Sequence, residues 1–455
     1  MKEWIYNNGP IWLQNLLVSG YGAKLYYERY FGFKPYREFL ERSQWLSSDE
    51  IERASAKMLG ELLTHAYRTV PYYRSLFDRI GIRPQHEAPL SLLADIPLLQ
   101  KEVIRRDQRQ LLSSKFAKGE LITLNTSGTT GKSLQLFVDI ESRRKAYAFT
   151  NRYHAWAGLK NGRNNVTFGG RAIVPPQQKK PVFWRYNAAM GNYLFSSYHM
   201  SDANLPYYLE KIRKIQPAFI EAYPSAAYLL AKYVIDHGPA GLRPKAILTS
   251  GETLFDHQRE LIQEAFGCSV FDQYGCTEQA LFVSQCEQGA YHVHPEFGLV
   301  ELLDDQDFPV PPGVTGRVVC TSFVNMAMPL IRYEIGDTAQ WGSRGCSCGR
   351  YFPVLKKICG RQDDYIVTPE GNRIGRLDPI FKGIRSVKEA QIVQERTDFI
   401  RVVIVPGEEF GTKDSASIIN ELQKRTGSSV SISLEVVDAI ERTANGKIRS
   451  VISKL

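Results

Sequence analysis

The chain carries the loop Thr126-Ser127-Gly128-Thr129-Thr130-Gly131-Lys132 between two short β-rich runs, residues 121–125 and 134–138. Its glycines let the backbone approach a ligand closely, its hydroxyls and amides can donate hydrogen bonds to phosphate oxygens, and its lysine adds positive charge. It is not a Walker A loop, because two residues rather than four separate Gly128 from Gly131 and a strand rather than a helix follows. Taken alone, the segment also fits a Gly/Thr hairpin turn.

The segments on either side of this loop alternate between strand-like and helix-like patterns. Upstream, Ser48 is placed to cap a helix whose apolar residues recur three and four positions apart and which ends before Pro71. Downstream, the alternation predicts an α/β architecture. The strand-like runs are residues 165–168, 218–221 and 246–249, and the helical stretches are residues 201–215, 225–236 and 254–265.

The length of 455 residues exceeds what one hydrophobic core usually serves. We expect a large layered α/β domain over residues 1–361, with a small β-rich subdomain at about residues 296–350, where short strands and turns replace the alternation. Two strand-like runs, an amphipathic helix at residues 415–425 and a further strand predict a compact and mobile α+β domain over residues 362–455.

The composition is that of a globular protein, with 43% hydrophobic and 23% charged residues. The net charge of +9 is spread over scattered basic pairs, so we expect no nucleic-acid partner, and the excess suits a polyanionic small ligand. We expect no export signal and a cytoplasmic, reduced setting, in which the seven cysteines form no disulfides.

The N-terminal residues up to Phe33 are apolar and aromatic, but Asn, Gly and Pro interrupt them too often for a membrane span. Packing against the main domain is the favoured interpretation. Peripheral contact with a membrane surface stays open, because Lys24, Arg29 and Lys34 accompany the apolar residues.

Further motifs follow the first loop along the chain. Together they resemble, in family order and over nearly the whole chain, the adenylate-forming superfamily, and more narrowly its phenylacetate–CoA ligase-like branch, which includes capsular polysaccharide biosynthesis proteins. One departure is Ser133, which stands where the family commonly has proline. The motifs are Thr249-Ser250-Gly251-Glu252-Thr253, Asp272-Gln273-Tyr274-Gly275-Cys276-Thr277-Glu278, Arg332-Tyr333-Glu334-Ile335-Gly336-Asp337, Gly360-Arg361-Gln362-Asp363-Asp364 and Arg442-Thr443-Ala444-Asn445-Gly446-Lys447-Ile448-Arg449.

The resemblance implies an enzyme that uses ATP and Mg²⁺ to join a carboxylic acid to AMP and then passes the acyl group to coenzyme A. It places residues 126–132 over the ATP pyrophosphate and Lys447 at the adenylation step. It further implies that Glu278 holds Mg²⁺, a hard cation that prefers carboxylate oxygen. The other implied roles are adenine contact for Ser250, Gly251, Glu252, Tyr274 and Gly275, a phosphate bond for Thr277, ribose binding for Asp337, ribose or phosphate contact for Arg361, and the domain hinge for Asp363.

Some assignments keep an alternative. Asp363 also fits a plain loop aspartate, and a lone terminal lysine such as Lys447 is usually a solvated charge. The family segments that approach the nucleotide suggest an acid pocket, and aromatic residues in it would favour aromatic acids. Candidate pocket residues are Phe168, Gly169, Gly170, Tyr223, Pro224 and Tyr274.

The acceptor of the acyl group is open between coenzyme A, an amine on a sugar and a carrier-protein thiol. A non-catalytic nucleotide-binding or assembly protein on the same fold is the alternative from another functional class. The sequence does not predict the oligomeric state.

Cysteine and histidine form a separate group. Three sulfurs, from Cys286, Cys346 and Cys348, and one imidazole suit tetrahedral zinc, and four ligands leave no open position, so the site would be structural. The histidine is His292 or His294, and we favour His292, since some members of the resembled branch look to have this set. Thiols without a metal are the alternative.

Overall fold

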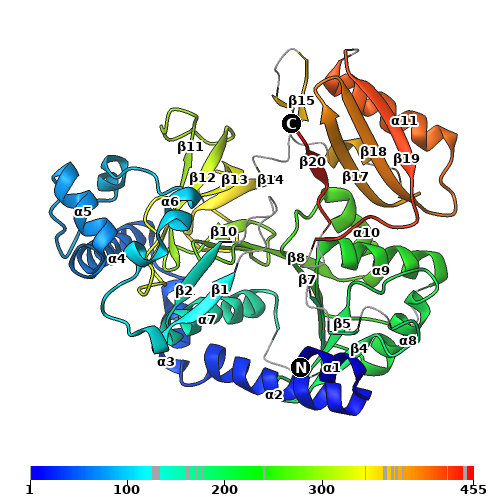
Figure 1. Cartoon of the computed structure of the whole chain (residues 1–455), viewed down its shortest axis with the longest axis horizontal. Coiled ribbons are helices and arrows are strands. Elements are labelled where there is room, and N and C mark those ends of the chain that lie inside the picture. The colour runs from blue at the N-terminus through cyan, green and yellow to red at the C-terminus, as the bar shows by residue number, and fades with distance from the viewer. Residues whose placement is uncertain are drawn as a thin grey trace.

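The computed structural model describes most of the chain. The described residues are 2–125, 134–159, 164–169, 173–175, 178–238, 241–343, 345–361, 366–369, 373–374, 378–381, 384, 386–427, 429–443 and 448–455. Figure 1 shows the N-terminal helices along the bottom and left of the molecule, a large sheet in the middle and a separate small domain at the top.

The N-terminal helices are α1 (Lys2–Asn8), α2 (Ile11–Tyr30), α3 (Lys34–Ser43), α4 (Ser48–Thr69), α5 (Pro71–Ile80) and α6 (Lys101–Arg106). The cap of α4 is Ser47 and not Ser48. Its hydroxyl accepts from the Glu50 amide while the Glu50 carboxylate accepts from the Ser47 amide, so both exchange bonds of a capping box are formed. The helix ends before Pro71, as predicted.

A single sheet of twelve strands forms the centre of the large domain, in the order β11-β12-β13-β14-β10-β9-β8-β7-β6-β3-β5-β4. The strands from β8 to β5 are parallel to one another, and β4 pairs antiparallel at the end. These strands are β3 (Asn165–Gly169), β4 (Trp184–Asn187), β5 (Asn192–Ser196), β6 (Phe219–Ala222), β7 (Ala246–Ser250) and β8 (Ser269–Gly275).

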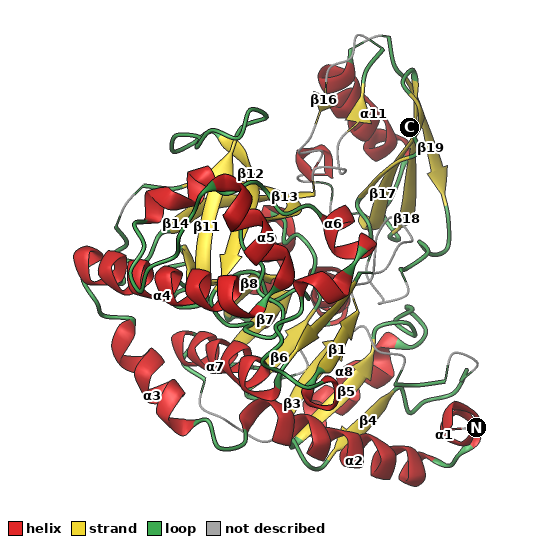
Figure 2. Cartoon of the chain, turned by 60° about the vertical axis from the view of Figure 1, so that its left-hand side comes forward, coloured by secondary structure: helices red, strands yellow, loops and turns green. Residues whose placement is uncertain are grey.

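Helices cover both faces of the parallel strands (Figure 2). Successive residues of a strand point to opposite faces. On β7, Ala246 and Leu248 therefore pack with Phe149 of α7 (Ile140–Trp156), while Ile247 packs on the other face with α9 (Pro224–His237). The α/β alternation predicted from the sequence is confirmed, with α8 (Leu205–Ile215) and α10 (Asp256–Phe266) as further crossover helices.

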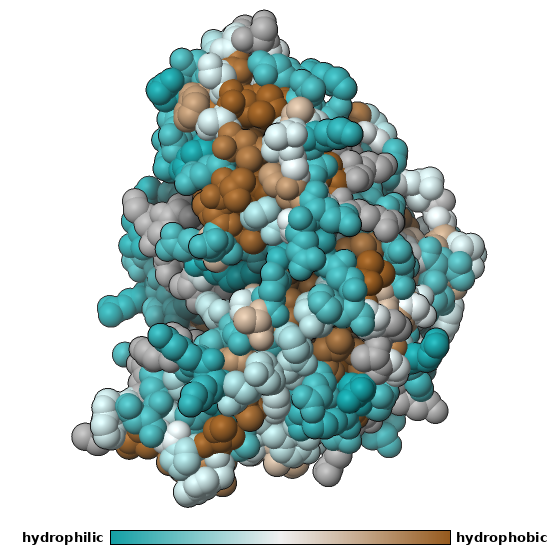
Figure 3. All heavy atoms as spheres, turned by 90° about the vertical axis from the view of Figure 1, so that its right-hand side faces the viewer, coloured by the Kyte–Doolittle hydropathy of each residue, from teal (hydrophilic) through white to brown (hydrophobic). Residues whose placement is uncertain are grey.

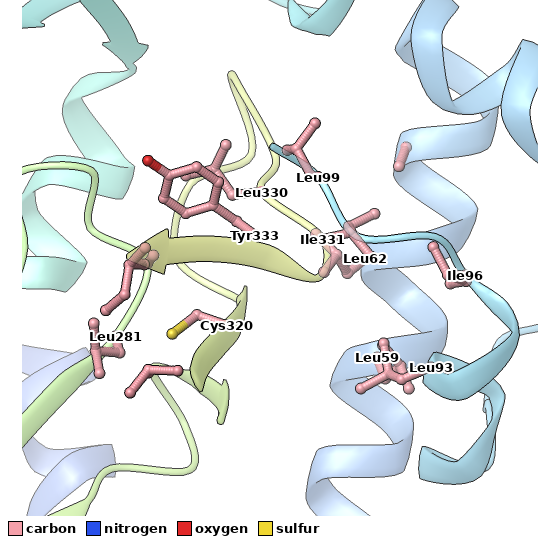
Figure 4. Packing of buried hydrophobic residues seen from close by; sticks show 14 of the residues in the cluster. Leu59, Leu62, Leu93, Ile96, Leu99, Leu281, Cys320, Leu330, Ile331 and Tyr333 are labelled. Carbon is pink, nitrogen blue, oxygen red and sulfur yellow. The ribbon is translucent and has the colours of Figure 1, made fainter. Parts of the chain in front are cut away.

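The remaining strands extend the same sheet in antiparallel pairing. Figure 4 shows the core below them, where Leu59 and Leu62 of α4 lie against Leu93 and Ile331. The strands are β9 (Phe282–Gln285), β10 (Tyr291–Val293), β11 (Gly298–Leu303), β12 (Thr315–Ser322), β13 (Tyr333–Trp341) and β14 (Val354–Arg361), and a separate hairpin pairs β1 (Ile122–Asn125) with β2 (Gln135–Val138).

The C-terminal domain is a four-stranded sheet in the order β19-β18-β17-β20 with one helix. That helix covers one face, and a smaller apolar cluster lies on the other. Figure 3 shows hydrophobic side chains gathered in the upper part of one side of the molecule, which this domain occupies. The elements are β15 (Ile366–Val367), β16 (Arg373–Ile374), β17 (Val387–Arg396), β18 (Phe399–Pro406), α11 (Thr412–Thr426), β19 (Ser431–Val436) and β20 (Val451–Ser453).

Membrane spans can be judged for the described helices alone. Among these, none combines the length and the apolar character that crossing a bilayer requires.

Candidate functional site

The parallel strands end at one edge of the sheet. Because they run in the same direction, Gly169, Ala222, Ser250 and Gly275, the last residues of β3, β6, β7 and β8, come to the same side. Ligands of open α/β sheets bind at this side. The segments expected to touch the acid and the adenine, which are far apart in sequence, are thus neighbours.

Tyr274 and Asp337 are joined directly. The phenol of Tyr274, near the end of β8, donates a hydrogen bond of 2.8 Å to Oδ2 of Asp337 on β13. Burial, and after it the Asp337 carboxylate, raises the pKa of Tyr274 well above its ordinary value, so the phenol stays protonated and a donor. The expected adenine and ribose residues therefore lie side by side.

The backbone next to Asp337 is held by a lysine from outside the motifs. Lys101, at the start of α6, donates to the carbonyl of Ile335 at 2.7 Å. Gly336 has a φ of +77°, which favours glycine, and a Cβ there would lie 3.2 Å from the Lys101 ammonium. No sequence signal marks Lys101, because nothing in its own segment resembles a ligand loop.

Glu278 is buried in the turn after β8, with 8% of its surface exposed. Its Oε1 accepts a hydrogen bond of 3.1 Å from the phenol of Tyr333 on β13. Mg²⁺ in nucleotide sites is bound by one or two protein carboxylates together with the phosphates. A carboxylate that is held in place by a hydrogen bond, as Glu278 is, therefore fits the role of an Mg²⁺ ligand. Thr277, immediately before it, is exposed at the same turn.

Tyr333 lies within the motif Arg332–Asp337, but the resemblance implies no role for it in the site. It is fully buried, and burial together with Glu278 raises its pKa far above the ordinary value, which keeps the phenol a donor. Strand alternation could have indicated that Tyr333 points to one face of β13, but not which carboxylate it meets there.

Glu252 connects the nucleotide edge to the C-terminal tail. Its carboxylate accepts from the amide of Ser225 at 3.0 Å, from the Ser225 hydroxyl at 3.1 Å and from the amide of Ile448 at 3.1 Å. Burial raises the pKa of Glu252, and these hydrogen bonds oppose that shift. Ile448 directly follows Lys447 in the sequence, so the segment of the expected adenylation lysine reaches this edge.

Two further contacts join the domains. Lys388 of β17 forms an ion pair with Asp202, and the phenol of Tyr228 on α9 donates to the carbonyl of Val387 at 3.4 Å. Asp202 is largely exposed and Lys388 is mostly covered.

Several expected site residues fall outside the described residues. These are Thr126, Ser127, Gly128, Thr129, Thr130, Gly131, Lys132, Gly170, Asp363 and Lys447. For Arg361 only the backbone is described: it is the last residue of β14, and it lies opposite Asp337 in the pairing with β13.

The cysteine and histidine group is brought together from the β9–β10 hairpin, where His292 lies on β10, and from the loop before β14. The ligand atoms of Cys286, His292, Cys346 and Cys348 all lie within 4.8 Å of one another. Cys286 Sγ is 3.8 Å from Cys346 Sγ, close to the edge of about 3.8 Å of a tetrahedron with Zn–S bonds of about 2.3 Å. Cys348 Sγ is 3.3 Å from Nε2 of His292. The set fits a tetrahedral ion.

The structure also separates the two candidate histidines. Nδ1 of His292 lies 3.3 Å from the carbonyl of Phe352, a partner that fixes the ring with Nε2 toward the sulfurs. His294 is instead bonded to Ser284 and Arg152, at 2.8 and 3.1 Å. The favoured member of the group, His292, is therefore the one that lies with the cysteines.

Comparison with known proteins identifies homologues of this chain. Residues 366–454 match the family model of the CapK C-terminal domain. Protein CapK of Staphylococcus aureus is 28% identical over 472 aligned positions, which cover all of both chains. The phenylacetate–coenzyme A ligase of Thermus thermophilus is 25% identical over 71% of this chain and 73% of its own. The chain is a homologue of CapK and of the phenylacetate–coenzyme A ligases.

The solved structures show the same fold for this CapK homologue. A 2-hydroxyisobutyryl-CoA ligase in the postadenylation state, in complex with R3-HIB-AMP, matches 91% of this chain and 92% of its own, with a TM-score of 0.72 and 21% identity. The same ligase in an open conformation, with 2-HIB-AMP and CoA, matches with a TM-score of 0.60. The expected adenylate-forming fold is thereby confirmed.

Proposed function

We propose that this chain is an AMP-forming carboxylate–coenzyme A ligase. In the first step, an oxygen of the acid bonds to the α-phosphorus of ATP, and the bond to the leaving pyrophosphate breaks, giving acyl-AMP. In the second step, the thiol of coenzyme A loses its proton and attacks the acyl carbon, and AMP leaves. The names of the phenylacetate–coenzyme A ligases, which align with about 70% of this chain, support this reaction class.

The first step requires two anions to meet. Mg²⁺ held by Glu278 supplies countercharge to the phosphates when bound. We assign the backbone and hydroxyl donors of residues 126–132 to the pyrophosphate and the Lys447 ammonium to the charge that builds on the α-phosphate. Tyr274 and Asp337 orient the nucleoside, and proximity then supplies much of the rate.

One observation carries the proposal: the hydrogen bond from the Ile448 amide to Glu252. It brings the tail that follows Lys447 to the loop after β7, on the same sheet edge as Tyr274. A mobile domain that delivers its lysine to the nucleotide needs such a docking point. The better match to the postadenylation structure than to the open one, 0.72 against 0.60, agrees with this arrangement.

In the second step, we propose that the C-terminal domain turns about Asp363. The turn withdraws Lys447 and clears a path for the thiol. Contacts that hold the present arrangement include the Glu252 bond, the Tyr228 bond and the Lys388–Asp202 ion pair. All of these are polar contacts, which water can replace when the domain turns.

For the acid, we propose an aromatic or similarly flat substrate. Tyr223, directly after β6 at the nucleotide edge, is partly exposed and offers a ring surface. Phe168 does not line the edge in the same way, because it is 2% exposed and packs against Phe195 and Tyr208 in the core. For the acceptor, we propose coenzyme A over an amine or a carrier thiol, because the ligases to which the chain is similar are named for it.

The test is ATP–pyrophosphate exchange with a panel of carboxylic acids, followed by mass spectrometry of products formed with coenzyme A, an amino sugar or a carrier thiol. We expect exchange with at least one acid, loss of exchange in Lys447→Ala, and a thioester of coenzyme A. Measurable ATP binding with no exchange for any acid would instead support a non-catalytic nucleotide-binding homologue.

A further inference from the structure

Helix α2 is apolar on two opposite faces but packs with only one of them. Its inner face lies against α7 and β4, with Gly22 and Leu25 buried. The approach to β4 is so close that a Cβ on Gly22 would collide with the side chain of Asn187. The helix is thus firmly seated. Side chains on its other face are largely exposed, and one of them, Tyr27, lies under the guanidinium of Arg144, 4.9 Å from the ring centroid.

The outer face carries a stripe at helical spacing. Trp12, Leu16, Ala23 and Tyr27 follow one another by four, seven and four positions, which places them on one side of the helix. Trp12 and Leu16 are 68% and 62% exposed, and Trp4 on α1 adds a ring that is 70% exposed. We call this the outer aromatic face: Trp4, Ile5, Trp12, Leu16, Tyr26, Tyr27 and Phe31.

Exposed hydrophobic side chains are concentrated in the N-terminal helices. Of the twenty large hydrophobic side chains that are exposed in the described part of the chain, ten lie between residues 4 and 31. Single exposed hydrophobic residues need no explanation, but a contiguous apolar patch marks a protein or membrane contact.

The charges around the face are mostly positive. Glu28 is the single acidic residue between positions 4 and 34; its side chain is only 11% exposed and pairs with Arg143 at 3.2 Å. Lys24 lies 3.6 Å from the same carboxylate, and its own side chain is 68% exposed on α2. Lys179 and Lys180 are exposed in the loop beside it, which is tied to α2 through the chain of hydrogen bonds Gln14–Arg185–Gln178.

We propose that the outer aromatic face binds the surface of an anionic lipid bilayer. Tryptophan and tyrosine rings favour the boundary between headgroups and acyl chains, and the lysines complement anionic headgroups. A second copy of this chain is a poorer partner, since a self-complementary contact would set the same lysines against one another. The contact would lie on the membrane, in agreement with the absence of a spanning helix among those described.

The position of the face suits this role. Figure 1 shows α1 and α2 along the bottom of the molecule and the C-terminal domain at the top. Binding through the bottom would leave the upper domain free to turn, so membrane contact and the ligase reaction do not compete for space.

The test is cosedimentation of the full chain with vesicles of phosphatidylcholine, with and without phosphatidylglycerol, at low and high salt. We expect binding to the anionic vesicles that weakens with salt. Replacing Trp4, Trp12 and Leu16 by serine should lower the partition coefficient at least about tenfold, since each buried apolar group adds to the affinity. The matched control replaces Phe308 and Tyr351, which are 63% and 60% exposed elsewhere, and should bind like the parent.

A charge variant, Lys24→Glu with Lys179→Glu and Lys180→Glu, should lose the preference for phosphatidylglycerol. Circular dichroism and ATP binding confirm that each variant is folded. The proposal is overturned if the parent binds no vesicle, or if the serine variant binds equally well. It is also overturned if sedimentation shows that the parent is a dimer which the serine variant breaks while vesicles bind neither.

Discussion

At the scale of single residues, Glu252 shows how a buried carboxylate can act as a connector. It accepts from α9 through Ser225 and from the tail through Ile448, so a single side chain links the crossover helix, the nucleotide loop and the C-terminal domain. Hydrogen bonds to a charged group contribute about 1.5–3 kcal/mol each.

We therefore expect Glu252→Ala to slow ATP–pyrophosphate exchange by about tenfold or more, the factor that corresponds to the loss of one such bond. Glu252→Gln should retain more activity, because its carbonyl still accepts. Thioester formation from supplied acyl-AMP should change little.

The control for this variant is Glu260→Ala, an exposed glutamate on α10. Equal slowing of both half-reactions in Glu252→Ala would contradict the docking role and indicate general damage to the fold.

A second prediction for a single residue concerns the buried His154 on α7. Burial lowers the pKa of His154 to about 4, and its Nε2 has no hydrogen-bond partner among the described groups. Below about pH 6.5, His154 is protonated in the unfolded chain, whereas in the folded chain it stays neutral down to about pH 4. The free energy of unfolding therefore falls as the pH falls from about 6.5 toward 4.

We expect the free energy of unfolding of the parent to drop by about 1–2 kcal/mol more between pH 7 and pH 5 than that of His154→Phe. Urea unfolding at both pH values measures the difference. Parallel loss of stability in the two proteins would show that this histidine already titrates normally in the folded state.

At the scale of elements, the cysteine and histidine group fastens the β9–β10 hairpin to the loop before β14. Cys286, directly after β9, and His292 on β10 come from the hairpin, and Cys346 and Cys348 come from the loop. Burial lowers the pKa of His292 to about 4, so its ring is neutral near pH 7, as a metal ligand must be. We propose that the group holds one structural Zn²⁺.

Metal analysis should find about one zinc per chain, as expected for one tetrahedral site. Cys348→Ser should lose the metal and lower the melting temperature by several degrees, whereas Cys268→Ser, outside the group, should keep both. If metal analysis finds no zinc in the parent, and Cys348→Ser leaves the melting temperature unchanged, the group is a set of packed thiols without a metal.

The elements also show what could be predicted from the sequence. The strands β3, β6 and β7 and the helices α8, α9 and α10 were predicted because short β-rich runs alternate with helical stretches in their own segments. Strand β4 was missed because it contains Arg185, which is fully buried yet satisfied by Gln14, Gln178 and two carbonyls. Such compensation comes from distant segments and leaves no local pattern.

For the same reason, only part of the candidate site could be predicted from the sequence. The motifs indicated Glu278, Asp337 and Tyr274 by kind and order, but their partners are set by packing. Tyr333 reaches Glu278 and Lys101 reaches Ile335 only because β13 lies beside both the turn after β8 and the start of α6.

At the scale of the whole molecule, the ion pair between Lys388 and Asp202 reports on the closure of the two domains. Exposed pairs contribute at most about 1 kcal/mol, so Asp202→Lys should slow pyrophosphate exchange about two- to fivefold. The exchanged pair, Asp202→Lys with Lys388→Asp, should recover most of the rate.

High salt should reduce the difference between these variants, since screening acts on exposed charges. Failure of the exchanged pair to recover, with normal stability, would mean that the contact plays no part in the closed arrangement.

The continuity of the twelve-stranded sheet bears on how the chain is made. Strands β7 and β8 sit in the middle of the order, and each carries part of the nucleotide edge. A ribosome delivers β3 to β8 before β9 and the strands beyond it exist, so a half-synthesised chain presents β8 as an unpaired strand border that invites association with other chains. We expect synthesis that stalls before β9 to yield aggregates, with chaperones engaging the nascent chain until that strand has emerged.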